Sequence, residues 1–263
     1  MALDQPLLSA LITRLRGAQR LLFITGAGVS ADSGLPTYRG VGGLYEDCLT
    51  DDDLPIETIL SGEMFARRPE LTWRYLKDIE AACRGATPNA AHRILATLAK
   101  EFEVWVFTQN VDGLHLAVAH GELTSYHVVE IHGNLHRLRC TQCVHRAAVA
   151  DYQTLPPLPI CPRCGAVVRP DVVLFGETLP EATMDRYYRE LERGFDAVFS
   201  VGTTSLFPYI SAPLIWAREV GITTVEINPG TTELSAWVDF KFPAGAAVTL
   251  TALGVALGLG DGG

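Results

Sequence analysis

Residues 21–40 read LLFITGAGVSADSGLPTYRG, which is an apolar run followed by a glycine turn and then by a more polar segment. The apolar run at residues 21–24 predicts a buried strand, and Gly26-Ala27-Gly28 follows it at once as a tight turn. The residues after the turn can begin a short helix, whose first backbone N–H groups have no partner inside the helix and can bind an anion. The stretch therefore predicts a strand, a glycine turn and an anion site.

The same turn partly matches the dinucleotide-binding fingerprint. Gly26-x-Gly28-x-x-Ala31 has the required spacing, and a small third residue allows close packing of helix on strand. The fingerprint also expects an acidic residue about 20 positions further on, at the end of a second strand. Asp47 lies near that distance, but its neighbours do not form a strand-like pattern. An ordinary strand-to-helix turn is therefore the alternative, and other segments must decide.

The composition describes a globular, acidic chain. Its 263 residues are 48% hydrophobic and carry a net charge of −9, which suits one α/β domain with or without a small insert. The negative charge argues against nucleic acid and leaves a basic peptide as a partner. Residues 1–17 predict an amphipathic helix rather than a signal peptide, and no apolar run reaches the ~20 residues of a membrane span. We therefore expect a cytoplasmic protein with no membrane partner; its oligomeric state is open.

Four of the six cysteines form two C-x-x-C pairs, Cys140 with Cys143 and Cys161 with Cys164, separated by residues 144–160. Each pair places two thiolates on one tight turn, and two such turns close a tetrahedron around Zn²⁺. Disulfide pairing is the alternative, which a non-secreted chain disfavours. All four ligands are sulfur and none is left for water, so we predict one structural zinc ion.

Three further apolar runs end in polar residues. Residues 104–108 lead into Gln109-Asn110-Val111-Asp112, residues 197–201 into Gly202-Thr203-Thr204-Ser205, and residues 223–227 into Asn228. In an open α/β sheet the carboxyl ends of the strands meet at one edge, where ligands bind. We therefore predict ligand-binding groups at this edge; for the first run, a turn in which Asp112 caps a helix is the alternative.

A fourth apolar run, residues 126–131, ends in His132-Gly133. A strand end holds this histidine on rigid backbone, at the same edge as Gly26 and Asn110. Histidine titrates near neutral pH, which suits a general base. We therefore predict that His132 takes part in catalysis.

In combination and in this order, the motifs are far more specific than any one of them. From about residue 20 to residue 248 the sequence resembles the sirtuin family of NAD-dependent protein-lysine deacylases. The stretches that carry the resemblance are GAGVSADSGLPTYRG, TQNVDGLH, EIHGN, the two C-x-x-C pairs, FGE, GTTS and INPG.

The resemblance implies an α/β fold, in which a Rossmann-like parallel sheet has helices on both faces. It implies a large domain at about residues 1–36, 96–136 and 170–263. A small domain would combine a cofactor loop and helical module, at about 37–95, with a zinc ribbon at 137–169. NAD and an acyl-lysine peptide would meet between the two domains.

The resemblance also assigns roles to individual residues. It implies that His132 and Asn110 are catalytic and that NAD is consumed as a co-substrate. The residues that it assigns to NAD are Gly26, Ala27, Gly28, Ser30, Tyr38, Arg39, Gln109, Asn110, Asp112, Gly202, Thr203, Thr204 and Asn228. Tyr38 stands where phenylalanine is commoner in the family. The residues that it assigns to the peptide are Val172, Phe175, Gly176 and Glu177.

The implied chemistry cleaves NAD. The acyl oxygen of the substrate attacks C1′ of the nicotinamide ribose, and nicotinamide leaves. His132 then activates a ribose hydroxyl, which attacks the acyl carbon. Lysine and 2′-O-acyl-ADP-ribose are the implied products.

The helix that begins near Pro69 bears on the choice of acyl group. Family members that remove succinyl or malonyl groups carry a tyrosine and, three residues on, an arginine in the helix after a tryptophan. Aligned on Pro69 and Trp73, this chain has Leu76 and Ile79 at those places. Neither side chain can bind a carboxylate, which needs a charged or hydrogen-bonding partner once it is desolvated. We therefore expect acetyl or a larger apolar acyl group.

Two other functions are weighed against deacylation. Mono-ADP-ribosyl transfer or NAD hydrolysis would break the same glycosidic bond, although the zinc module and the FGE segment favour a peptide substrate. An NAD-sensing zinc-ribbon interaction module would not need Asn110, Asp112 and His132 together.

Overall fold

The computed structural model describes residues 3–37, 50–119 and 125–260. Its larger part is built on a six-stranded sheet in which every neighbouring pair is parallel. In spatial order the strands are β3 (Tyr126–Glu130), β2 (Glu103–Thr108), β1 (Arg20–Thr25), β7 (Ala197–Val201), β8 (Thr223–Ile227) and β9 (Phe240–Phe242). This is the strand order of the Rossmann fold, whose switch point lies between β1 and β7.

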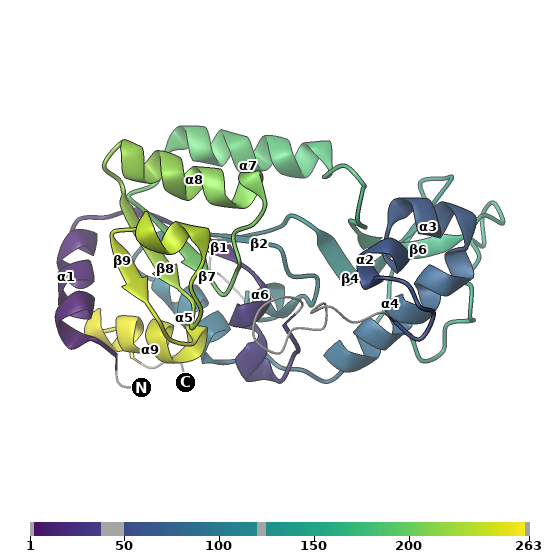
Figure 1. Cartoon of the computed structure of the whole chain (residues 1–263), viewed down its shortest axis with the longest axis horizontal. Coiled ribbons are helices and arrows are strands. Elements are labelled where there is room, and N and C mark those ends of the chain that lie inside the picture. Colours follow the sequence, from purple (N-terminus) through teal and green to yellow (C-terminus); the bar gives the residue numbers. More distant parts are fainter. Residues whose placement is uncertain (1–2, 38–49, 120–124, 261–263) are drawn as a thin grey trace.

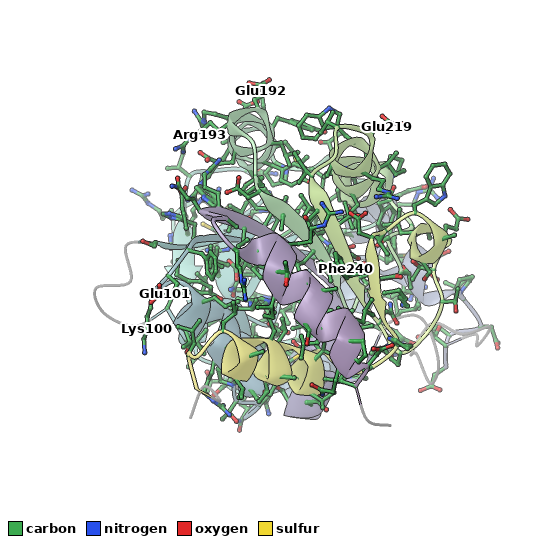
Figure 2. The ribbon with its side chains drawn as sticks, turned by 90° about the vertical axis from the view of Figure 1, so that its left-hand side faces the viewer. Lys100, Glu101, Glu192, Arg193, Glu219 and Phe240 are labelled. Carbon is green, nitrogen blue, oxygen red and sulfur yellow. The ribbon has the colours of Figure 1, made fainter. Side chains whose placement is uncertain are left out.

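The central strands are apolar because helices cover both faces of the sheet. Along β1, Phe23 stacks on Phe199 with 4.4 Å between ring centroids and faces α1 (Gln5–Leu15), α5 (Ala90–Leu98) and α9 (Ala246–Ala256). Leu22 and Ile24 face the other side, toward α7 (Glu181–Arg193) and α8 (Pro208–Glu219). Figure 1 shows these two helical layers, and in the end view of Figure 2 the strand that carries Phe240 lies between them. The predicted α/β architecture with helices on both faces is confirmed.

A second, smaller sheet lies at the far end of the molecule (Figure 1). It is antiparallel, with β4 (Gly133–Cys140) between β5 (Arg146–Ala148) and β6 (Val168–Val172). The helices α2 (Ile56–Ile59), α3 (Gly62–Arg67) and α4 (Pro69–Cys83) pack on it. Trp73 of α4 is fully buried there, and its Nε1 donates to the Val168 carbonyl oxygen at 2.8 Å.

The division into two domains remains a prediction, and the packing refines it. α5 lies within residues that the sequence resemblance assigns partly to the small domain. However, Ala91, Ile94 and Leu95 pack into the helical layer against the large sheet. We propose that the large domain resumes at the start of α5 rather than near residue 96.

The segment after the glycine turn is not the short α-helix that the sequence suggested. It forms two 3₁₀ turns, Ala27–Val29 and Ala31–Ser33, and ends at Gly34 with a φ of 81°. The Gly28 N–H donates to the Gly202 carbonyl oxygen on the neighbouring loop, which ties this backbone to β7 instead of to a regular helix. The remaining short helices are α6 (Leu114–Ala117) and a 3₁₀ turn at Glu233–Ala236. Among the described residues, no helix is long and apolar enough to cross a membrane.

Candidate active site at the carboxyl edge of the sheet

The glycine turn after β1 packs directly against the turn after β7. A Cβ atom on Gly28 would lie 2.7 Å from the Gly202 Cα, and Gly202 itself has a φ of 60°. The amides of Gly26 and Gly28 donate to the carbonyl oxygens of Val201 and Gly202 at 3.0 and 2.8 Å. These glycines therefore join the two turns at the switch point. Of the three predicted amide donors, Ala27 alone is left without a partner among the described residues.

Thr203 connects three strand ends. Its Oγ1 accepts a hydrogen bond from Gln109 Nε2 at 2.8 Å, and its carbonyl oxygen accepts one from Asn228 Nδ2 at 2.9 Å. Gln109 follows β2, Thr203 follows β7 and Asn228 follows β8, so the polar residues predicted from three separate runs meet at one edge. Thr204, the next residue, is exposed at this edge.

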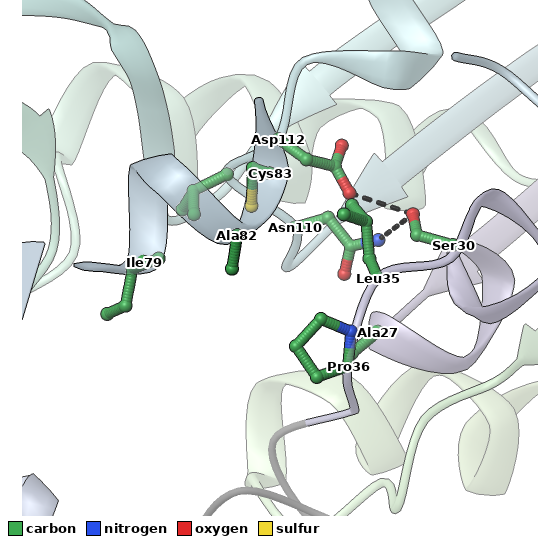
Figure 3. Close-up of a pocket in the computed structure, with 10 residues that line it drawn as sticks. Ala27, Ser30, Leu35, Pro36, Ile79, Ala82, Cys83, Asn110 and Asp112 are labelled. Carbon is green, nitrogen blue, oxygen red and sulfur yellow. Dashed lines mark hydrogen bonds between the residues drawn. The ribbon is translucent and has the colours of Figure 1, made fainter. Parts of the chain in front are cut away.

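Ser30, Asn110 and Asp112 form a hydrogen-bonded cluster (Figure 3). Ser30 Oγ donates to Asp112 Oδ2 at 2.8 Å and accepts from Asn110 Nδ2 at 3.1 Å. The Leu114 N–H donates to Asp112 Oδ1 at 2.9 Å, so Asp112 also caps α6. Burial raises the Asp112 pKa, and the hydrogen bonds from Leu114 and Ser30 oppose that rise. The capping role and a ligand-binding role are therefore compatible at this residue.

Two buried histidines lie beside this region, one against Ser30 of the cluster and the other against Thr25 at the end of β1. His92 Nε2 lies 3.5 Å from Ser30 Oγ, and His115 Nε2 lies 3.0 Å from Thr25 Oγ1. Their ring centroids are 4.7 Å apart. Burial lowers the pKa of His92 to about 4 and that of His115 well below its ordinary value, so both rings are neutral at pH 7. Neither histidine is among the predicted site residues, because no local pattern indicates that α5 lies beside Ser30 or α6 beside Thr25.

A pocket opens beside the cluster, and its other walls are apolar. Leu35 and Pro36 close one side, and Ile79, Ala82 and Cys83 of α4 close another (Figure 3). Burial raises the Cys83 pKa to about 11, so this thiol is neutral. The pocket thus lies between residues at the edge of the large sheet and α4 of the helical module. Tyr38 and Arg39, which the sequence also predicted there, lie outside the described residues.

His132 lies between β3 and β4, two residues after Glu130, and is partly buried. Its Nε2 lies 2.8 Å from the hydroxyl oxygen of Tyr209 in α8. Burial lowers the pKa of His132 to about 4, and a hydrogen bond to the Gln109 backbone partly opposes that shift. The imidazole is therefore neutral at pH 7, as a general base must be before it accepts a proton. Tyr209 is not among the predicted site residues, because it is 77 residues away along the chain and no local pattern connects it to His132.

The predicted peptide segment runs from β6 to the FGE turn. Phe175 N donates to the Leu60 carbonyl oxygen at 2.9 Å, and Gly62 N donates to the Phe175 carbonyl oxygen at 3.0 Å. The Glu177 carboxylate accepts from the buried Arg169 guanidinium at 2.5 and 3.0 Å, and from Leu174 N at 2.9 Å. In this structure Glu177 therefore fixes the turn, which keeps the segment extended beside α3.

The four paired cysteines meet at the end of the small sheet. Their sulfur atoms all lie within 4.8 Å of one another, with Cys140 and Cys164 3.4 Å apart and Cys143 and Cys161 3.7 Å apart. A tetrahedral ion with bonds of about 2.3 Å needs sulfur atoms about 3.8 Å apart. These separations fit zinc, and all four thiols are free rather than joined in disulfides. The predicted four-cysteine site is confirmed as a cluster that suits structural zinc.

The Sir2 family model matches residues 26–207, which include the switch point, the polar cluster, His132 and the four cysteines. The chain belongs to the Sir2 family. A relative from Pseudomonas aeruginosa, "NAD-dependent protein deacylase 2", is 50% identical over 231 residues, which cover 86% of this chain and 88% of the relative. A protein of the same name from Pseudomonas syringae pv. tomato is 48% identical, over 91% of this chain and 96% of that protein.

Solved structures of Sir2 homologues share the fold over nearly the whole chain. A complex of a Sir2 homologue with NAD is 35% identical, with a TM-score of 0.81 over 95% of this chain and 94% of that one. A mutant Sir2 homologue with 2′-O-acetyl ADP ribose is also 35% identical, with a TM-score of 0.80 over 97% and 98%. A Sir2 complex with a p53 peptide and NAD⁺ is 26% identical, with a TM-score of 0.79 over 96% and 99%.

Proposed function

We propose that the pocket beside Ser30, Asn110 and Asp112 takes the nicotinamide end of NAD, and that His132 is the general base of deacylation. Membership of the Sir2 family and the two closely related deacylases make the chain an NAD-dependent protein deacylase. The observation that carries the residue assignment is the polar cluster itself. It is buried at the switch point of the sheet and opens into a pocket that α4 completes.

The polar cluster suits an amide-bearing ring. A carboxamide offers both a donor and an acceptor, and the Asp112 carboxylate and the Asn110 amide can match both of them. Ser30 holds these two side chains together, so the cluster is in place before the ligand arrives. The remainder of NAD would extend along the edge past Ala27, Gln109 and Thr204 toward Asn228.

We assign the peptide to the extended segment from Val172 to Glu177. Its substrate would be an acyl-lysine, in keeping with the peptide that a solved Sir2 homologue binds together with NAD⁺. The Glu177 ion pair with Arg169 fixes this segment, and a strand-like peptide would pair with the backbone groups that the bonds from Phe175 to Leu60 and Gly62 leave over. The chain's net charge of −9 favours basic peptides.

The acyl group would be apolar. We place it along the α4 wall of the same pocket, across from the polar cluster that takes nicotinamide; Ile79, Ala82 and Cys83 form that wall, and none of them carries a charge. Leu76, the other position in the sequence argument, is buried in the core of the small domain. None of these side chains can pair with a succinyl carboxylate.

One assay tests the proposed function against its alternatives. The protein is incubated with NAD and a panel of acetyl-, longer acyl- and succinyl-lysine peptides, and nicotinamide, free lysine peptide and O-acyl-ADP-ribose are quantified. We expect equal amounts of all three products, with apolar acyl groups preferred. Nicotinamide release without deacylated peptide would instead indicate NAD hydrolysis or ADP-ribosyl transfer, and peptide binding without any product would indicate an interaction module.

A further inference from the structure

Tyr209 is held firmly in place opposite His132. Its ring stacks on Phe207, with 5.5 Å between centroids and 10° between planes. The hydroxyl of Tyr187, a fully buried residue of α7, donates to the Tyr209 carbonyl oxygen at 2.6 Å. The Tyr209 and His132 rings meet edge to face, with 6.1 Å between centroids and 80° between planes. The contact between the Tyr209 hydroxyl and His132 is therefore built in by α7 and α8.

The hydrogen bonds to His132 determine which ring nitrogen carries the proton. The Gln109 backbone bonds the imidazole in the way that favours its protonated form, which identifies the Gln109 group as an acceptor for a ring N–H. Because Nε2 faces Tyr209, that N–H belongs to Nδ1. Burial raises the Tyr209 pKa to about 12, so its hydroxyl keeps its proton and donates it to Nε2. Nε2 therefore presents its lone pair on the side where a base must accept a proton.

We propose that Tyr209 is a positioning residue for deacylation, whose hydroxyl holds His132 with an unprotonated Nε2 until a ribose hydroxyl replaces it. This inference rests on the proposed role of His132. When the base acts, the ribose O–H bond breaks and an Nε2–H bond forms, while the electron pair stays on the ribose oxygen that attacks the acyl carbon. The new Nε2–H can then donate to the Tyr209 oxygen, because a hydroxyl both donates and accepts.

The kinetic test uses Tyr209→Phe, which removes the hydroxyl and keeps the stacked ring. We expect kcat for deacylation to fall about tenfold, the equivalent of one lost hydrogen bond of about 1.4 kcal/mol. Nicotinamide exchange precedes the His132 step, so its rate and the KM for NAD should stay within about twofold of wild type. In a His132→Ala background the same substitution should cause no further loss.

Tyr188→Phe is the matched control, because Tyr188 is the half-exposed neighbour of Tyr187 on α7. It should leave both rates unchanged. If Tyr209 acts only through packing, deacylation in Tyr209→Phe will equal wild type. If it acts only through NAD binding, exchange and deacylation will fall together. Either result overturns the proposal.

The second measurement does not depend on activity. Nitrogen-15 shifts of the imidazole of His132 in the free, full-length protein report which nitrogen carries the proton, and His132→Ala identifies the signals. We expect the Nδ1–H form in wild type and a mixture of the two neutral forms in Tyr209→Phe; an Nε2–H form in wild type would overturn the proposal. A wild-type protein that makes no deacylated peptide would contradict the proposed function instead, and the shifts would still decide whether Tyr209 fixes the ring.

Discussion

The large and small sheets are stabilised in different ways. In the large sheet, residues 21–25, 104–108, 197–201 and 223–227 are all buried, and helices pack on both faces. In the small sheet every residue of β5 is exposed, and β4 and β6 depend on one cluster with α4 and on the four cysteines at their ends. We therefore expect packing alone to hold the first, and the second to depend on the metal as well.

The candidate catalytic residues and the metal site lie on different sheets. The polar cluster and His132 lie at strand ends of the large sheet, and their hydrogen bonds are made within that body. The small sheet and the helices packed on it add the α4 wall of the pocket and, through β6, the start of the predicted peptide segment. Changes at the sheet edge should therefore alter catalysis in an intact fold, whereas changes at the cysteines should alter the fold of one half of the molecule.

His132→Ala is the sharpest change at the sheet edge. A general base contributes about 10²- to 10⁴-fold to the rate, so we expect deacylation to fall by that factor. Nicotinamide exchange should persist, because it precedes the step in which the base acts. Product analysis and exchange of labelled nicotinamide measure the two rates. Deacylation at the wild-type rate would remove His132 from the mechanism.

Removal of the metal tests the other half of the comparison. Cys143→Ser should lose the bound zinc and increase amide hydrogen exchange in β4 and β6, because three short strands lose their crosslink. Exchange in β1, β2 and β7 should change little. Cys83→Ser is the control for metal content. Cys83 lies outside the cluster, so this variant should still bind one zinc ion per chain. Equal loss of protection in both sheets would show that the metal supports the whole molecule.

The sequence predicted the large sheet well because its strands are short apolar runs that end in glycine or polar residues. Residues 197–201 and 223–227 were predicted with their observed bounds. The paired cysteines were equally informative, because two C-x-x-C turns at this separation predict a tetrahedral metal site. Local pattern was sufficient wherever the fold depends on neighbours along the chain.

Contacts between distant segments could not be predicted in this way. The fingerprint assigns Gly26 and Gly28 to a ligand, whereas in the structure their amides donate to Val201 at the end of β7 and to Gly202 after it, and the close packing leaves no room for a side chain. The same contact replaces the expected helix with 3₁₀ turns. Tyr209 was missed for a similar reason: a tyrosine at a helix start carries no sign that it meets a histidine 77 residues away.

The free energy of unfolding should fall in acid, because buried neutral histidines lie at the carboxyl edge of the large sheet. Burial lowers the pKa of His92 and His132 from 6.5 to about 4, so the unfolded chain binds more protons than the folded one between these values. Their contribution is complete above pH 6.5 and is lost as the pH falls toward 4. Urea unfolding from pH 7 to 4.5 should show this decrease, and His132→Ala should make it shallower. An unchanged slope in that variant would mean that His132 is not buried as a neutral ring.

The smallest expected effect lies at the α4 wall, where the two halves of the molecule meet. Ile79→Ala should enlarge the pocket beside Asn110 by a few carbon atoms, and each buried CH₂ is worth about 0.8 kcal/mol. The ratio of kcat/KM for a longer apolar acyl group to that for acetyl should therefore shift several-fold. Asp78→Ala, an exposed neighbour on the same helix, should leave the ratio unchanged. A preference for succinyl-lysine in either protein would contradict the apolar pocket, whereas an unaltered ratio in Ile79→Ala would place the acyl group against the large sheet alone.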